Sequence, residues 1–209
     1  MLVEAQQNDA FFRVLQQTSL NIPDGIGLIL ASHFLRKPIP ERITGIDTMI
    51  DLVQHLSGGS IFLLGAAPGV AERAAAVLVS MNPSITIAGT CSGSPRCDDA
   101  PAILAQINRA QPTILFVAFG APAQECWIAK HLSSMPSVRL AMGVGGAFDF
   151  LAGVQHRAPR MFQVLGLEWL WRLLAQPWRW KRIFRAVVVF PWKVLIGSRQ
   201  ETVDRRQKN

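Results

Sequence analysis

"SIFLLGAAPGVAERAAAVLVSM", Ser60 to Met81, decides the fold class of this chain. An almost continuous apolar run ends in glycine and leads into a stretch with apolar residues at helical spacing. The same order recurs in "ITIAGTCSG" with "AILAQINRA", in "TILFVAFG" with "APAQECWIAKHL", and in "RLAMGVGG" with "AFDFLAG". Hydrophobic strands that alternate with helices indicate a parallel sheet covered on both faces. We therefore predict a doubly wound, mostly parallel, Rossmann-like α/β fold.

Helices are also predicted outside these repeats. Ala5–Ser19 and Gly25–Leu35 show helical spacing ahead of the first strand, and the prolines of "RKPIPER" end the second helix. The 209 residues suffice for one sizeable core. We predict an α/β domain over residues 1–166, a C-terminal amphipathic helical appendage over residues 167–198, and a polar tail over residues 199–209.

The net charge of +7 arises in the C-terminal fifth of the chain. Up to Gly166, eleven Lys and Arg residues balance eleven Asp and Glu residues, whereas from Leu167 onward ten stand against three. The same segment holds five of the six tryptophans, namely Trp169, Trp171, Trp178, Trp180 and Trp192. This mixture favours an anionic membrane surface over nucleic acid, because a bulky apolar face fits a membrane better than a phosphate backbone. A solvated basic face on an amphipathic helix is the alternative.

Several classes of protein are disfavoured by composition. No run reaches the roughly 18 to 20 apolar residues that span a bilayer. The N-terminal "MLVEAQQNDAFF" has neither the basic nor the apolar region of a signal peptide, so we expect the chain to stay on the cytoplasmic side. Three cysteines and four scattered histidines do not match zinc-binding spacing, which predicts reduced thiols and no structural metal.

Ligands of doubly wound sheets bind beyond the carboxyl ends of the strands. Three of these ends carry the glycine motifs "LLGAAPG", "VAFGAPAQE" and "GVGGAFD". The first lacks the G-x-G-x-x-G spacing of a dinucleotide site, and the chain has no Gly-Lys-Ser/Thr sequence of a P-loop. What remains is either a loop that lets a ligand approach the backbone closely or a plain tight turn.

Polar side chains in the second and third motifs are candidates for binding a ligand. Gln124 can both donate and accept, which suits a sugar or a base edge. Glu125 lies at the mouth of the predicted site, or simply provides favourable charge in the first turn of a helix. Asp149 could accept hydrogen bonds from ribose hydroxyls or cap a helix.

The stretch "NIPDGIGLIL", Asn21 to Leu30, contributes one aspartate, Asp24, ahead of an apolar run. Read alone, Asp24 is a turn residue or the N-cap of the helix that follows.

Six motifs taken together resemble the WecG/TagA/CpsF family of bacterial glycosyltransferases. They are "NIPDGIGL", "RITGID", "FLLGAAPGVAERAA", "VAFGAPAQECWIAKH", "GVGGAFDFLAG" and "RAPRMFQVLGLEWLWRLLAQPWR", in this order from about Asn21 to Arg185. The resemblance implies transfer of a sugar from a UDP-sugar to an undecaprenyl-diphosphate-linked saccharide at the inner face of the plasma membrane. The implied sugar is N-acetylmannosamine, its uronic acid or glucose, used in teichoic acid or other surface polysaccharide synthesis.

The resemblance also implies roles for individual residues. Asp24 matches the catalytic base and Gln124 the active-site glutamine, whereas Asp149 matches the aspartate at the ribose. Arg172, Arg179 and Arg182 match arginines that fold over the diphosphate at the membrane. We predict that the nucleotide-sugar is bound by Gly65, Gly120, Pro122, Glu125, Gly145, Gly146 and Asp149.

The implied reaction is an inverting, metal-independent transfer without a cofactor. One base takes the proton of the acceptor hydroxyl, and a carboxylate with a reference pKa of about 4 must rely on its position for that task. Since no Asp-x-Asp pair or histidine cluster is present to hold a metal, guanidinium groups are the available source of charge for the leaving diphosphate.

One departure from the family pattern concerns the N-terminus. Family members usually carry a further segment that ends in a Thr-x-Asn-like stretch, and this chain begins at "MLVEAQQNDAFF". We expect that the natural start lies upstream; otherwise the chain is a catalytically impaired UDP-sugar-binding fragment. A Rossmann oxidoreductase and a peripheral membrane or nucleic-acid protein are the remaining rival classes, and a homo-oligomer is left open.

Overall fold

The computed structural model describes residues 1–159, 161–162, 167–177 and 180–194, the side chains of 172, 175 and 182 excepted. The chain forms two compact units. The first, which we call the sheet unit, comprises Met1, Asn8–Leu20 and Gly45–His156. The second, which we call the helical unit, comprises Leu2–Gln7, Asn21–Thr44 and the described residues from Arg157 onward. The domain boundaries drawn from sequence stay predictions.

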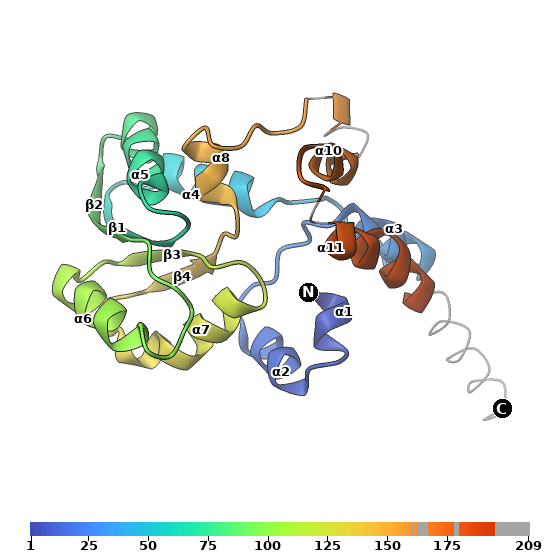
Figure 1. Ribbon diagram of the computed structural model, residues 1–209, viewed down its shortest axis with the longest axis horizontal. Coiled ribbons are helices and arrows are strands. Elements are labelled where there is room, and N and C mark those ends of the chain that lie inside the picture. The colour runs from blue at the N-terminus through green and yellow to red at the C-terminus, as the bar shows by residue number, and fades with distance from the viewer. Residues whose placement is uncertain (160, 163–166, 178–179, 195–209) are drawn as a thin grey trace. The chain divides into compact units, whose positions relative to one another are not determined.

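A parallel sheet forms the centre of the sheet unit (Figure 1). Its strands lie in the order β2-β1-β3-β4. Their bounds are Gly59–Gly65 for β1, Ile85–Cys91 for β2, Ile114–Ala118 for β3 and Leu140–Gly143 for β4. All three strand pairings are parallel. The predicted doubly wound α/β fold is thereby confirmed.

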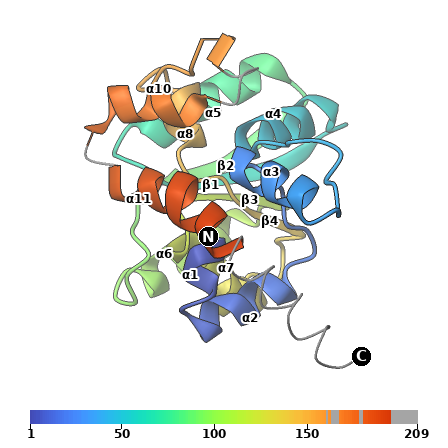
Figure 2. The same ribbon diagram turned by 90° about the vertical axis from the view of Figure 1, so that its right-hand side faces the viewer.

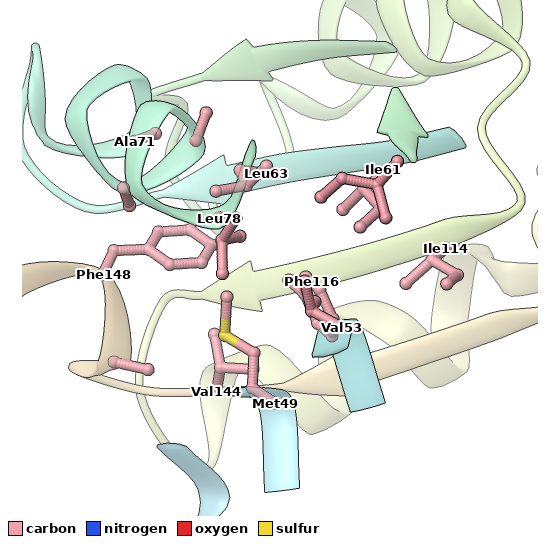
Figure 3. Packing of buried hydrophobic residues seen from close by; sticks show 14 of the residues in the cluster. Met49, Val53, Ile61, Leu63, Ala71, Leu78, Ile114, Phe116, Val144 and Phe148 are labelled. Atoms are coloured by element: carbon pink, nitrogen blue, oxygen red, sulfur yellow. The ribbon is translucent and has the colours of Figure 1, made fainter. Parts of the chain in front are cut away.

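The central strands β1 and β3 bury both of their faces, as their continuous apolar sequences predict, whereas the edge strands β2 and β4 are largely half-buried. Ile61, Leu63 and Phe116 pack on one face, and their sequence neighbours Phe62, Leu64 and Val117 pack on the other. This alternation follows from the two-residue period of side chains along a strand. Figure 3 shows the first face, where the side chains of Leu63, Leu78 and Phe148 lie together.

Helices cover both faces of the sheet. The first face carries α4 (Gly45–His55), α5 (Val70–Met81) and α8 (Ala147–Leu151). The second face carries α6 (Ala100–Ala110) and α7 (Ala123–His131), which a 3₁₀ turn, η1 (Leu132–Ser134), follows. Figures 1 and 2 show these two layers on opposite sides of the strands. Helix α4 begins at Gly45, within the "RITGID" motif, and was not predicted as a helix.

The helix predicted over Ala5–Ser19 is confirmed over Asp9–Gln17, but it is not continuous from Ala5. The chain instead forms α1 (Leu2–Ala5) in the helical unit and α2 (Asp9–Gln17) in the sheet unit. Asn8 separates them, because its extended backbone and its side-chain oxygen, 3.0 Å from the Phe11 amide nitrogen, form the N-cap of α2.

The helical unit contains α3 and the C-terminal helices. Helix α3 spans Ile26–Phe34, close to its predicted range, and α10 spans Glu168–Ala175. Helix α11 (Trp180–Phe184) continues into the π-helix η3 (Arg185–Val189). Gly27 of α3 approaches η3 closely, since a Cβ atom there would lie 3.3 Å from the Ala186 carbonyl oxygen.

Candidate functional site

The strand order places a topological switch point between β1 and β3. The chain leaves β1 for β2 on one side and returns past β1 to β3, so the crossovers on the two sides of this point run over opposite faces. Ligands of open α/β sheets bind at the carboxyl ends of such strands. The first glycine motif follows β1 and the "GAPAQE" motif follows β3, so both predicted ligand loops lie at the switch point.

Gly65 at the end of β1 allows the backbones of β1 and β3 to come close together. Its φ of +104° disfavours any residue with a side chain, and a Cβ atom there would lie 3.0 Å from the Ala118 carbonyl carbon. The loop therefore requires glycine at this position. This requirement is structural and holds with or without a bound ligand.

Gln124 joins the loops that follow β3 and β4. Its side chain is 4% exposed, and its Oε1 atom accepts hydrogen bonds from the backbone amides of Gly120 and Gly145, both at 3.0 Å. Its Nε2 atom donates to Oε1 of Glu125 at 2.9 Å. The amide that sequence reasoning assigned to a ligand thus has its acceptor occupied by the main chain. We call this arrangement the Gln124 clasp.

Gly143 leaves the space that the Gln124 clasp occupies. A Cβ atom on Gly143 would lie 2.5 Å from Nε2 and 2.8 Å from Cδ of Gln124, closer than real Cβ contacts come. Sequence reasoning did not single out this glycine, although it is the first residue of the quoted "GVGG".

Two carboxylates lie beside the clasp loops in sequence. The Oε2 atom of Glu125 is buried and has no hydrogen-bond partner among the residues that the structure describes. A buried acceptor of this kind gains from a hydroxyl or N–H group of a ligand. Asp149 lies in the first turn of α8, whose N-cap residue is Gly146, so both the ribose and the capping interpretation of Asp149 stay predictions. Pro122 is the N-cap residue of α7.

Asp24 lies in the helical unit, one residue ahead of the N-cap of α3. That cap is Gly25, so the N-cap interpretation of Asp24 is wrong. The Asp24 side chain is 61% exposed, and its Oδ1 atom lies 3.8 Å from Nη2 of Arg42. Arg42 also donates from Nε to the Asp24 carbonyl oxygen at 2.8 Å, and it pairs with Glu168 at the start of α10. Neither Arg42 nor Glu168 was named as a site residue from sequence, although both lie in the quoted motifs.

Of the three predicted diphosphate-binding arginines, the structure describes the backbone of two. Arg172 lies on α10 and Arg182 on α11, but their side chains are outside the description. Arg179 lies outside the described residues altogether. Helix α11, η3 and the helical residues that follow expose large apolar side chains at four-residue spacing: Trp180 54%, Phe184 50%, Val188 48% and Trp192 64%.

Comparison with known proteins agrees with this architecture. The family model described as "Glycosyl transferase WecG/TagA/CpsF family" matches residues 1–204. The chain belongs to the WecG/TagA/CpsF family. A relative from Staphylococcus aureus (strain MRSA252) is 34% identical over 200 residues, which cover 94% of this chain and 76% of the relative. A second, from S. aureus (strain NCTC 8325 / PS 47), matches with the same identity and coverage. Both are named N-acetylglucosaminyldiphosphoundecaprenol N-acetyl-beta-D-mannosaminyltransferase.

Membership of the WecG/TagA/CpsF family confirms the prediction of a glycosyltransferase. It does not favour the alternative of a catalytically impaired fragment. Among the described residues, no helix is long and apolar enough to cross a bilayer. Within the same residues, no three His, Cys, Asp or Glu side chains gather in a way that could hold a metal ion. Metal independence stays a prediction.

Proposed function

We propose that the chain transfers N-acetylmannosamine from its UDP derivative to N-acetylglucosamine linked to undecaprenyl diphosphate, with inversion and without a metal. The name of the S. aureus relatives supports both the sugar and the acceptor. The observation that carries the proposal for this chain is the Gln124 clasp, which fixes the glycine loops at the carboxyl edge of a doubly wound sheet. Such an edge is where a nucleotide-sugar binds in this class of fold.

The donor site is assigned to the loops of the sheet unit. The absence of side chains at Gly65, Gly120 and Gly145 lets a ligand approach the backbone of these loops closely, while the amides of Gly120 and Gly145 are held by Gln124. The orphan Oε2 atom of Glu125 supplies an acceptor for a hydroxyl or N–H group of the donor. Asp149 is assigned to the ribose on the family resemblance.

Asp24 is assigned as the base. The acceptor hydroxyl oxygen attacks the anomeric carbon opposite UDP, the bond from that carbon to the diphosphate oxygen breaks, and the hydroxyl proton passes to the carboxylate. A carboxylate that is 61% exposed can receive this proton. The family resemblance assigns Arg172, Arg179 and Arg182 to neutralising the diphosphate that leaves.

The C-terminal helices are assigned to an anionic membrane surface. Their exposed stripe of Trp180, Phe184, Val188 and Trp192 lies among basic residues, including Lys181 and Arg185. Interfacial helices with this pattern bind at the headgroup level. Flotation with vesicles that contain an anionic phospholipid should recover the chain, and serine at Trp180 and Trp192 should reduce the floated fraction. Flotation with neutral vesicles alone would contradict the electrostatic part of the assignment.

Transfer is tested with purified chain, a synthetic polyprenyl-diphosphate-linked N-acetylglucosamine and a radiolabelled donor. The donors are UDP-N-acetylmannosamine, its uronic acid and UDP-glucose, each with and without EDTA. We expect transfer from the first donor, with EDTA changing the rate less than about twofold. No transfer from any donor overturns the proposal, and a rate that EDTA abolishes and Mg²⁺ restores overturns its metal-independent part.

The base is tested with Asp24→Asn. We expect turnover to be lost while the affinity for UDP, measured by calorimetry, changes less than about twofold, because the carboxylate is needed only for the proton transfer. Asp51→Asn, at an exposed position of α4, is the matched control and should keep its rate. Normal turnover in Asp24→Asn would refute the assignment.

A further inference from the structure

Arg42 connects the segment that holds Asp24 to the first turn of α10. Its Nε atom donates to the Asp24 carbonyl oxygen at 2.8 Å, and its Nη2 atom pairs with Oε2 of Glu168. These contacts join residues 18 and 126 positions apart in sequence, all within the helical unit. One guanidinium can do this because its five donors project in a fixed planar arrangement.

The contact between Arg42 and Glu168 is largely shielded from water. Their side chains are 20% and 17% exposed, whereas the Arg185–Glu4 ion pair of the same unit has side chains 63% and 40% exposed. Exposed ion pairs contribute little to holding a geometry, and shielded hydrogen-bonded pairs contribute more. Glu168 is therefore the principal partner of the Arg42 side chain, and its place in α10 fixes where the guanidinium lies.

The carboxylates of Glu168 and Asp24 lie at different distances from the Arg42 guanidinium. The guanidinium contacts Glu168 directly, but its Nη2 atom is 3.8 Å from Oδ1 of Asp24, beyond hydrogen-bond range. At this distance the guanidinium charge still stabilises the Asp24 anion, and a direct hydrogen bond would stabilise it further and weaken it as a base. In the observed arrangement, Arg42 fixes the backbone of Asp24 and makes no direct hydrogen bond to its Oδ1 atom.

We propose that Glu168 is a positioning residue for the base, acting through Arg42. By holding the guanidinium, Glu168 fixes the Asp24 backbone and sets the distance between Arg42 and the Asp24 carboxylate. Seating of α10 in the helical unit thereby sets the geometry of the base. This inference rests on the proposed role of Asp24.

The kinetic test compares Glu168→Gln, Glu168→Asp and Glu4→Gln with the wild-type chain. Glu168→Gln removes the charge that holds Arg42, and we expect kcat to fall at least about tenfold, because small displacements of a catalytic group are costly. The KM for the donor should change less than about twofold. Glu168→Asp restores the charge and should recover most of the rate. Glu4→Gln breaks the exposed pair with Arg185 and should leave kcat unchanged.

Hydrogen exchange provides a readout that does not need activity. The amide of Asp24 donates to the Ile22 carbonyl at 3.0 Å, and the amide of Ile43 donates to the Pro23 carbonyl at 3.3 Å. If Glu168 fixes this segment through Arg42, both amides should exchange at least about tenfold faster in Glu168→Gln and at the wild-type rate in Glu4→Gln.

The outcomes separate this inference from the proposed function. A wild-type chain without transfer activity refutes the proposed function, and exchange at Asp24 and Ile43 then decides whether Glu168 fixes the segment. Wild-type kcat and exchange rates in Glu168→Gln overturn the inference. It is also overturned if Glu168→Asp is as impaired as Glu168→Gln and both lose UDP affinity and thermal stability, since Glu168 then serves general folding.

Discussion

Removing the Gln124 side chain should loosen both glycine loops of the candidate donor site. In Gln124→Ala the amides of Gly120 and Gly145 lose their acceptor, which lies 3.0 Å from each in the wild-type chain. A buried donor left without a partner costs about 1–3 kcal/mol. Because both glycines are half-buried and water can reach part of the space, we expect the free energy of unfolding to fall by about 2–4 kcal/mol.

The assay pairs urea denaturation with residue-resolved hydrogen exchange. A loss of 2 kcal/mol corresponds to about a thirtyfold decrease in protection of the Gly120 and Gly145 amides. UDP affinity should weaken at the same time, since the loops are no longer held. Gln54→Ala, at an exposed position of α4, is the control and should change stability by less than about 0.5 kcal/mol.

The opposite result would place Gln124 at the substrate. If Gln124→Ala unfolds within about 0.5 kcal/mol of wild type and keeps its amide protection, the clasp does not hold the loops. A loss of turnover in such a variant would then come from a missing contact to the reacting sugar. The clasp predicts loss of stability and of UDP affinity together, whereas a pure transition-state contact predicts loss of kcat alone.

Three further predictions concern the sheet unit. Gly143→Ala should cost about 1–3 kcal/mol in urea denaturation and weaken UDP binding, because its Cβ atom would lie 2.5 Å from Nε2 of Gln124. Asn82→Ala should cost about 2–4 kcal/mol with the transfer rate unchanged, because its side-chain nitrogen donates to two carbonyls at the end of α4, at 2.7 and 2.9 Å. Burial, and to a smaller extent the Glu125 carboxylate, raises the pKa of the Cys126 thiol, so iodoacetamide at pH 8 should alkylate it more slowly than an exposed cysteine. Because the pKa is raised in the folded state, the neutral thiol favours folding. Its contribution to the free energy of unfolding is complete below the unfolded-state pKa of about 8.5 and is lost as the pH rises through the folded-state pKa. Cys126→Ser should therefore lose less stability than wild type on alkaline titration.

The sheet could be predicted because its central strands β1 and β3 carry nearly continuous apolar runs. Both faces of β1 are buried, so its sequence has no polar alternation and matches only a strand with helices on both sides. The ends of the helices were harder to predict from sequence. Asn8 is compatible with a helix interior by spacing, and only its side-chain bond to the Phe11 amide shows that it begins a new helix.

The role of Gln124 could not be read from sequence, because its partners lie in two different loops. Gly120 is four residues away, but Gly145 is 21 residues away and follows another strand. Only the parallel register of β3 and β4 brings that amide to Oε1. Arg42 was missed for the same reason, since its partner Glu168 is 126 residues distant.

The motifs "GVGG" and "GAPAQE" therefore pack together around the Gln124 side chain. In "GVGG" the first glycine, Gly143, leaves space for the Gln124 side chain, and the third residue, Gly145, donates its amide to that side chain. In "GAPAQE" the glycine donates the second amide to the same oxygen atom. A side chain at Gly143 would displace Gln124, and loss of Gln124 would release Gly120 and Gly145 together. The requirement for these residue types thus arises from the packing of the loops themselves, and the chemistry of transfer depends on the surface that this packing holds in place.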